Sequence, residues 1–406
     1  METPNVIAII DAAKAELDAI KRGKEFAQWQ GPTKQGLDYA LSQVEPFNAY
    51  DNVWIFTGDD GRVASTGAFG SWVVRRLVAG LDSGEVIAAF EAEAARNAAN
   101  YAEESPILGV TLDAPCDLGD GVTLTPPPEW IEGVSSPVSW PFNVEFPSDG
   151  TGILRQSFTV TPAFERRKSD DAFPTAPVNT SRPAAVRSAV RTKVRLACLL
   201  VSRGPVELPL SLFRPDEAAA FTGGAFDFEQ RPIQTRPRAN FLVRATEVAK
   251  AFAALNRFGD PSALERAIDR LGRSRVALND VDRALELGMA IEIALMHGKG
   301  SNTEITQRIG TRAAWLVGKD VADRLSIFEG VKQLYQARST AVHTGALSNR
   351  EALDLVESDA LVSRVLLALA MHARLPDWSR LTLGGGLTPF ADERNQAPRS
   401  AACDHA

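Results

Sequence analysis

The sequence predicts an α+β N-terminal region that contains a β-rich subdomain, followed by an all-α helical bundle. Apolar residues recur at helical spacing in roughly the first hundred residues, and short β-prone runs bounded by Gly, Pro, Asp and Ser follow up to residue 215. Helical spacing then returns and continues to about residue 375. With 406 residues the chain is long enough for two or three domains, each with its own core. The predicted regions are 1–104 (mainly helical), 105–230 (β-rich, sensory or regulatory), 241–375 (helical) and 379–406 (flexible tail).

The N-terminal region is expected to begin with an amphipathic helix and to continue with a hairpin and a second helix. The run NVWIF at 52–56 leads into GDDG at 58–61, a pattern typical of a strand that enters a turn. Residues 84–103 again follow a helical pattern. The apolar positions of the first helix are Val6, Ile9, Ile10, Ala13, Leu17 and Ile20.

The β-rich region is predicted to contain short strands separated by turn residues. Between the last two lies a Pro-rich basic stretch, residues 165–193, which we expect to be a long loop. Pro232 and Pro237 break regular structure in residues 216–240, so this segment is predicted to be a linker. The strand order cannot be read from the sequence. The predicted strands are ILGVTL (107–112), GVTLTP (121–126), FNVEF (142–146), ILRQSFTVT (153–161) and KVRLACLLVS (193–202).

The C-terminal region carries clear helix-start signals. Asp260-Pro261 is a typical start, because Asp serves as an N-cap and Pro fits the first turn. Ser348 and Glu351 form a capping-box pattern that is expected to open the last long helix. The three helices that matter for function are predicted at 280–297, 303–317 and 323–343.

Composition excludes several classes of protein. The formal net charge of −7 argues against a protein that coats nucleic acid non-specifically, although it leaves room for a local basic cleft. The cysteines form no CxxC pair, which argues against a disulfide framework or a structural zinc site and favours a reducing cytoplasm. No apolar run is long enough for a membrane span, so we expect no membrane association. The cysteines are Cys116, Cys198 and Cys403.

Arg338 occupies a position in the 323–343 helix where an apolar residue is expected. Helical spacing points it towards the bundle or a partner surface. Glu292 and Arg312 also fall on inward faces of the two preceding helices, and unpaired buried charges cost several kcal/mol. Glu292 is therefore predicted to pair with Arg338 or Arg312, and the sequence leaves the choice open. The stripe that leads to Arg338 and Val342 contains Leu325, Phe328, Val331, Leu334 and Tyr335.

His343 is one of only four histidines and follows Arg338 at R-x4-H spacing. Five residues correspond to roughly 140° around an ideal helix, so the two side chains do not share a face. Thr344-Gly345 offers a helix stop directly after His343, with Gly in a C-capping position. A site shared by two copies would bring the arginine and the histidine together. The alternatives are a structural ion pair for Arg338 and a helix-terminal histidine favoured by the dipole for His343.

Three strings between about residues 243 and 372 resemble HEPN domains, particularly the Apea-like branch: LELGMAIEIAL, EITQRIGTRAAWLVG and IFEGVKQLYQARSTAVHTG. HEPN domains are α-helical bundles, and many are metal-independent ribonucleases of toxin–antitoxin, abortive-infection and CRISPR-associated defence. Their hallmark is R-x(4–6)-H with a polar residue commonly following the arginine, and Arg338, Ser339 and His343 match it. The resemblance covers roughly a third of the chain. It implies RNA as substrate, a homodimer or higher oligomer, a possible trigger or antitoxin partner, and no cofactor.

These residue types suit RNA cleavage by the substrate's own 2′-OH. Histidine titrates near neutral pH, so His343 is predicted to be the general base or acid. Arg338 would hold the phosphate and stabilise the transition state, and Ser339 would orient one of them or the RNA. The product would be a 2′,3′-cyclic phosphate. Glu292, Arg312 and Tyr335 are expected to support the site.

Two other functions stay open. Many HEPN relatives are non-catalytic dimerisation or RNA-binding modules, and this is the main alternative. An enzyme whose site lies in the N-terminal region is the second. The remaining histidines offer no metal site, because none has a partner at metal-ligand spacing. They are expected to be a helix-capping residue, a packed residue and a tail residue: His297, His372 and His405.

Two basic runs interrupt the acidic chain, at 165–195 and 236–275. They are either a solvated surface with ion pairs or a track for RNA phosphates that leads to the helical site. The residues expected to bind RNA in such a track are Arg166, Arg167, Lys168, Arg270, Arg273 and Arg275.

Overall fold

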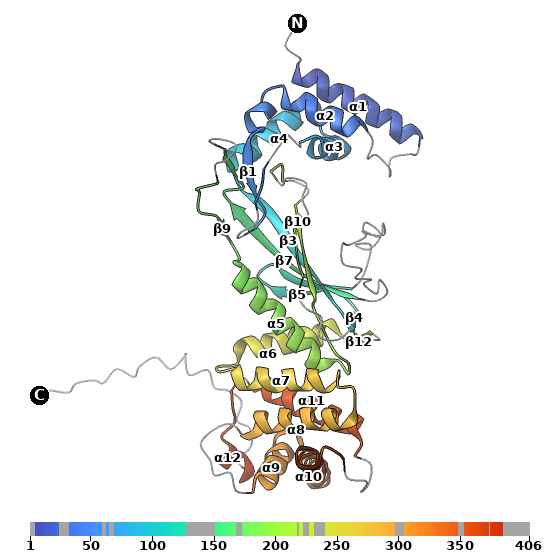
Figure 1. Ribbon diagram of the computed structural model, residues 1–406, viewed down its shortest axis with the longest axis vertical. Helices are drawn as coiled ribbons and strands as arrows, with labels where there is room; N and C mark the ends of the chain where they lie inside the picture. Colours follow the sequence, from blue (N-terminus) through green and yellow to red (C-terminus); the bar gives the residue numbers. More distant parts are fainter. Residues whose placement is uncertain are drawn as a thin grey trace, which may run out of the picture.

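The predicted α+β composition, with the sheet in the N-terminal part of the chain, is confirmed by the computed structural model. The molecule is elongated: N-terminal helices gather at one end, a long sheet crosses the middle and the C-terminal helices stack at the other end (Figure 1). The described residues are 5–23, 32–58, 62–64, 69–126, 151–167, 173–216, 219–221, 227–230, 240–296, 304–347, 353–372 and 374–384.

The N-terminal end combines helices with the predicted hairpin. The two strands of the hairpin pair antiparallel. A third strand pairs antiparallel with the other edge of the first strand. Buried aromatic rings from several of these elements pack together, with Phe47 and Phe90 at 4.3 Å between ring centroids. The elements are α1 (Val6–Gly23), α2 (Pro32–Ser42), η2 (Phe47–Tyr50), β1 (Val53–Phe56), β2 (Arg62–Ala64), α3 (Gly70–Val78), α4 (Ser83–Arg96) and β8 (Phe164–Arg166).

The helix predicted over 84–103 is too long. Asp82 and Glu85 form a capping box that starts it one residue earlier, at Ser83. Asn97 then adopts a left-handed backbone conformation (φ 44°, ψ 46°), which ends the helix at Arg96. The next strand begins at Ala99 and crosses the boundary predicted between residues 104 and 105.

In the described part of the chain the main sheet has the order β11-β10-β3-β7-β6-β5, with β9 paired to β7. All of its pairs are antiparallel, and β3 and β7 run side by side from Ala99↔Val160 to Ile107↔Gly152. A separate parallel pair joins β4 and β12. The strands are β3 (Ala99–Ile107), β4 (Val110–Leu112), β5 (Cys116–Gly119), β6 (Val122–Thr125), β7 (Gly152–Thr161), β9 (Asn179–Thr180), β10 (Leu210–Pro215), β11 (Asp227–Gln230) and β12 (Phe241–Val243).

Two predictions about this region are tested by these strands. The segment 216–240 is not purely a linker, because β11 lies within it and pairs with β10. The strands expected at 107–112, 121–126 and 153–161 are present in whole or in part. The strand expected at 142–146 lies outside the described residues.

The loop and strand predicted across 165–202 are wrong over their second half, which forms helix α5 (Ala184–Val201). Pro183 precedes its first turn, a position that proline tolerates well. Arg187, Arg191, Val194 and Cys198 follow one another at helical spacing and are all buried. The helical pattern is hidden in the sequence because two of its buried positions are arginines.

Those two arginines meet Glu103 of β3, which is fully buried. Arg187 Nε lies 2.7 Å from Glu103 Oε2, and Arg191 Nη1 contacts Oε1 of the same carboxylate. Ser211 of β10 donates a hydrogen bond of 2.6 Å to Oε1. This group, which we call the Glu103 network, satisfies a carboxylate in a place where an unpaired charge would cost several kcal/mol.

The Glu103 network lies between two apolar cores. The N-terminal core draws on residues 10–101, 158–164 and 213–221, whereas the C-terminal core draws on residues 107–124, 154, 194–208 and 243–381. Strand β3 therefore belongs to both cores, with Tyr101 in one and Ile107 in the other.

The C-terminal helices form the far end of the molecule (Figure 1). The three helices predicted at 280–297, 303–317 and 323–343 are confirmed as α8, α9 and α10 within a few residues. Among the described helices, none combines the length and apolar character needed to cross a lipid bilayer. The helices are α6 (Ala245–Arg257), α7 (Ser262–Ser274), α8 (Asp280–Met296), α9 (Ile305–Val317), α10 (Val321–Thr344), α11 (Leu355–Met371) and α12 (Trp378–Thr382).

Two predicted helix starts need correction. Helix α7 has Pro261 as its N-cap, although Asp260 Oδ1 still accepts a 2.9 Å hydrogen bond from Ser262 Oγ. The capping box at 348–351 does not open α11: the cap is Asp354, whose side chain accepts from two backbone amides of the first turn. Residues 348–352 themselves lie outside the described residues.

We predict that Glu103→Gln lowers the free energy of unfolding by about 3 to 5 kcal/mol, because it leaves two buried guanidiniums without a countercharge. Urea unfolding followed by circular dichroism measures the change. Glu329→Gln is the control, since Glu329 forms an exposed pair with Lys332 at 3.3 Å. That substitution should change stability by less than about 0.5 kcal/mol. Equal stability of the two variants would contradict the role of the Glu103 network.

Candidate active site

Helix α10 carries the predicted catalytic residues, and both of its ends are fixed. Asp320 is the N-cap and accepts a 2.9 Å hydrogen bond from the Asp323 amide. The predicted stop is confirmed: Gly345 adopts φ 69°, and its amide donates to the Ala341 carbonyl at 2.9 Å. His343 therefore lies in the last turn.

Arg338 pairs with Glu292 of α8, which confirms the predicted pairing and decides between its two candidates. Arg338 Nη2 lies 3.0 Å from Glu292 Oε2, and the side chains are 25% and 28% exposed. The guanidinium also lies 5.5 Å from the centre of the Tyr335 ring. Arg338 is thus held against α8 while part of its guanidinium still reaches solvent.

Tyr335 lies one turn before Arg338 on α10. Burial raises the pKa of its phenol, the charge of Glu292 raises it further, and Arg338 opposes the rise. The hydroxyl is therefore protonated at neutral pH and can donate a hydrogen bond. It does not suit the role of a general base.

Gly288 of α8 sets how closely α8 and α10 approach. A Cβ at this position would lie 2.6 Å from both Cβ and Cγ of Arg338. The apolar stem of Arg338 therefore rests directly on the α8 backbone, one turn before Glu292. Sequence reasoning missed this role. The available signal was a glycine inside an otherwise strong helical pattern.

Arg312 does not pair with Glu292. Its Nη1 donates a hydrogen bond to the Leu295 carbonyl at the C-terminal end of α8, and its guanidinium lies 5.1 Å from the Trp378 ring centre. Burial lowers the pKa of Arg312, and the charge of Arg308 lowers it further. Arg312 thus caps α8 about one turn beyond Glu292.

His343 and Ser339 belong to a different side of α10 from Arg338. They are four residues apart and so project in similar directions, whereas Arg338 is roughly 140° from His343. His343 is exposed and Ser339 half-buried. Within the described residues, no hydrogen bond or ion pair links His343 to Arg338. One chain therefore does not bring the R-x4-H pair together.

The apolar stripe predicted on α10 is partly wrong. Leu325 and Val342 are 61% and 57% exposed, whereas Val331 and Leu334 are buried as expected. Ile327 and Ala341 complete the buried face. Leu325 and His343 are eighteen residues apart, which is five full helical turns, so they project on the same side of α10. That side of the helix combines an uncovered apolar residue with the candidate catalytic histidine.

The predicted RNA track is not continuous. Arg166 lies on β8, which pairs with β1 near the N-terminal helices, whereas Arg273 lies on α7 in the bundle at the other end (Figure 1). Both are exposed, and Arg166 lies 5.6 Å from the centre of the Tyr50 ring. Arg167 lies over Trp54 at 5.0 Å, and Lys168 is outside the described residues.

Arg275 and Arg270 are held by carboxylates of the bundle. The prediction that Arg275 binds RNA is wrong, because its side chain is 2% exposed and forms a two-pronged ion pair with Asp359 of α11. Arg270 pairs with both oxygens of Glu286 at 3.1 Å. Arg270 and Arg275 therefore serve packing of the helices, whereas Arg273 is exposed.

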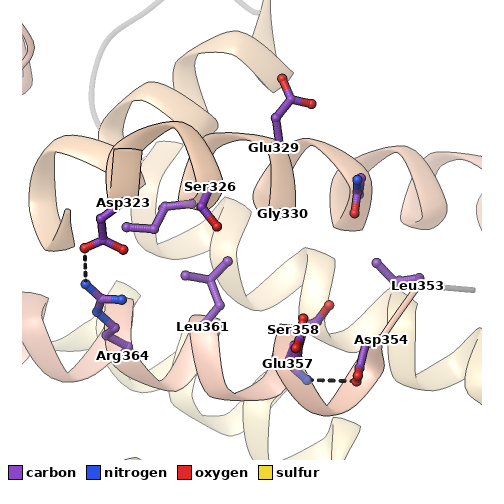
Figure 2. A pocket seen from close by; sticks show the side chains of 12 residues that line it. Asp323, Ser326, Glu329, Gly330, Leu353, Asp354, Glu357, Ser358, Leu361 and Arg364 are labelled. Atoms are coloured by element: carbon purple, nitrogen blue, oxygen red, sulfur yellow. Dashed lines mark hydrogen bonds and ion pairs between the residues drawn. The ribbon is translucent and has the colours of Figure 1, made fainter. Parts of the chain in front are cut away.

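A groove of about 390 Å³ lies between α10 and α11 (Figure 2). Carboxylates dominate its rim, and its one arginine, Arg364, is bound to Asp323 at 3.0 Å. Such a groove repels phosphate, so it does not suit RNA. None of the predicted site residues lines it. The lining residues are Asp323, Ser326, Ile327, Glu329, Gly330, Gln333, Leu353, Asp354, Glu357, Ser358, Leu361 and Arg364.

Of the other histidines, the structure describes His372. His372 is half-buried at the C-cap of α11, where burial lowers the pKa of its imidazole. His297 and His405 lie outside the described residues. Across the described part of the chain, no group of three or more His, Cys, Asp or Glu side chains is arranged to hold a metal ion.

No protein-family model matches this sequence, and comparisons with curated proteins and with solved structures return no match either.

We predict that Gly288→Ala destabilises the protein by about 1 to 3 kcal/mol, since the added methyl group must displace Arg338 or separate α8 from α10. Thermal and urea unfolding measure the effect. Gly36→Ala is the matched control in a helix, because nothing lies within 4 Å of its added Cβ. It should be neutral or slightly stabilising, by less than about 1 kcal/mol. A Gly288→Ala protein as stable as the control would show that the close approach is unimportant.

Proposed function

We propose that this protein is a metal-independent endoribonuclease of the HEPN type, whose R-x4-H site is completed in a homodimer. The observation that carries the proposal is the arrangement on α10. A largely buried arginine is held by one carboxylate, and an exposed histidine follows at R-x4-H spacing in the last turn of the same helix. The metal independence and the setting in antiviral defence, abortive infection or toxin–antitoxin systems come from the sequence resemblance.

The chemistry assigned to these residues needs two groups near one phosphodiester. His343 removes the proton from the 2′-OH, or protonates the departing 5′-oxygen, because imidazole exchanges protons near neutral pH. Arg338 binds the phosphate oxygens and stabilises the charge that develops on them. The 2′-oxygen attacks phosphorus and the bond to the 5′-oxygen breaks, which yields a 2′,3′-cyclic phosphate. Tyr335 and Ser339 would donate hydrogen bonds to the RNA or to the catalytic pair.

The dimer is proposed because one chain separates the two groups. Arg338 faces α8, whereas His343 projects from the uncovered side of α10 together with Leu325. A second copy that covers this side would bury Leu325 and could place its own Arg338 near His343. A trigger or antitoxin partner and a cytoplasmic location belong to the same proposal.

A second candidate function is a non-catalytic module for dimerisation or RNA binding. The ion pair between Arg338 and Glu292 favours it, because a paired arginine that packs on Gly288 also has a purely structural explanation. On this alternative the exposed side of α10 is an interaction surface without chemistry.

We predict that Arg338→Ala and His343→Ala each reduce RNA cleavage by about a hundredfold or more. Cleavage of a labelled RNA pool, followed by end-group analysis for the cyclic phosphate, measures the effect. Arg364→Ala and His372→Ala are the matched controls, because they remove the same residue types at places remote from the pair. Cleavage that survives both α10 substitutions would refute the proposed site. A folded wild-type dimer that cleaves no RNA would favour the second function.

We further predict that mixing Arg338→Ala protein with His343→Ala protein restores part of the lost activity. A mixed dimer can combine the intact histidine of one chain with the intact arginine of the other. The cleavage assay above, repeated after dissociation and reassociation of the two variants, gives the measurement. If the mixture stays as inactive as each variant alone, the site is not shared between chains.

A further inference from the structure

The ion pair between Arg338 and Glu292 differs from two other arginine–carboxylate pairs of the C-terminal helices, those of Arg275 and Arg270. Arg275 reaches Asp359 with two aligned hydrogen bonds, of 3.0 Å from Nε and 2.9 Å from Nη2. Arg270 Nη1 donates to both oxygens of Glu286 at 3.1 Å. The first pair has the two parallel hydrogen bonds with which a guanidinium binds a carboxylate best, and in the second both carboxylate oxygens accept a hydrogen bond.

In the Arg338–Glu292 pair the atoms are close but poorly aligned. Nη2 and Oε2 are 3.0 Å apart, yet Glu292 Oε2 is buried and accepts no hydrogen bond from the described residues. Arg338 Nε is likewise buried without an acceptor in that part of the chain. Buried polar groups are nearly always satisfied, so two unsatisfied atoms in one pair need an explanation.

The misalignment follows from the way Arg338 is anchored. Its Cβ and Cγ rest on the backbone at Gly288, and the Tyr335 ring lies beside its guanidinium. These contacts, and not Glu292, set the position of the Arg338 stem. The Glu292 carboxylate therefore supplies a negative charge, but its oxygens are not aligned with the N–H groups of the guanidinium. A phosphate group offers several oxygens around one centre and can accept hydrogen bonds from the Nη groups of Arg338, which, unlike Nε, are not closed off from solvent.

We propose that Glu292 is a resident counter-ion, which an RNA phosphate displaces from the guanidinium of Arg338. This inference rests on the proposed function, because it assumes that Arg338 binds the phosphate of RNA. Glu292 is thus a positioning residue. In the absence of RNA it neutralises the charge of Arg338 and orients its guanidinium. Its carboxylate lowers the affinity for RNA by competing for the same cation.

Glu292→Gln tests the proposal, because it removes the negative charge with little change in shape. We expect the dissociation constant for a fluorescein-labelled single-stranded RNA, measured by anisotropy, to fall about threefold to fivefold, the range of a partly exposed ion pair. KM should fall by a similar factor, with no rise in kcat. Glu286→Gln is the matched control, since it removes the charge of another half-buried pair on the same helix. Its RNA affinity should equal that of the wild type.

The outcomes separate this inference from the proposed function. If Arg338→Ala weakens RNA binding but Glu292→Gln binds no more tightly than the wild type, the counter-ion role is overturned and the ribonuclease proposal stands. If Arg338→Ala binds and cleaves RNA like the wild type, the proposed function itself fails. Should Glu292→Gln not fold, Glu292→Asp retains the charge but shortens its reach. It should bind RNA more tightly than the wild type, and unchanged or weaker binding would overturn the counter-ion role.

Discussion

The placement of the C-terminal bundle depends on one buried carboxylate, that of Glu103. Helix α5 packs on the sheet through two arginines one turn apart, and both reach this single side chain. Arg187 additionally lies 4.3 Å from the ring centre of Phe158 on β7. A helix that slid or turned on the sheet would leave these guanidiniums buried and unpaired, at a cost of several kcal/mol. The Glu103 network therefore fixes the position and rotation of α5 on the sheet more precisely than apolar packing alone would.

From α5 a series of contacts leads to the candidate site. Arg275, the C-cap residue of α7, donates a 2.7 Å hydrogen bond to the Leu199 carbonyl of α5 and binds Asp359 of α11. Arg270 of the same helix binds α8 through Glu286. Helix α8 in turn holds Arg338 through its backbone at Gly288 and through Glu292. Buried and half-buried arginines thus join the sheet to the helices that carry the candidate site.

The sequence predicted the helices and the ion pair of the candidate site better than it predicted the scaffold. The α10 helix, its glycine stop and the Glu292 pairing were predictable, because helical spacing places inward charges on neighbouring helices where they must meet. Helix α5 was missed because Arg187 and Arg191 occupy its buried face, and a pattern search treats arginines as solvent-facing. The same error assigned Arg275 to an RNA track. The end of α4 at Asn97 depends on a left-handed backbone, and the exposure of Leu325 depends on which helices surround α10. Asparagine signals such a stop less strongly than glycine does, and the exposure of Leu325 has no local signal at all.

The difference between Arg275 and Arg338 shows how one residue type can serve packing or chemistry. The Nε, Nη1 and Nη2 atoms of Arg275 all donate hydrogen bonds within the protein, and its side chain is closed to solvent. A ligand could bind Arg275 only if the surrounding helices moved apart. Arg338 has a charge partner but an incomplete set of hydrogen bonds, and a quarter of its side chain is open. An anion that approaches from solvent gains hydrogen bonds there that the protein does not supply. Because His343 projects from another side of α10, a single chain does not place this histidine beside an anion bound at its own Arg338. Under the proposed function, one chain is enough to bind an RNA phosphate, whereas cleavage of the RNA needs two chains. Association of the chains therefore controls cleavage.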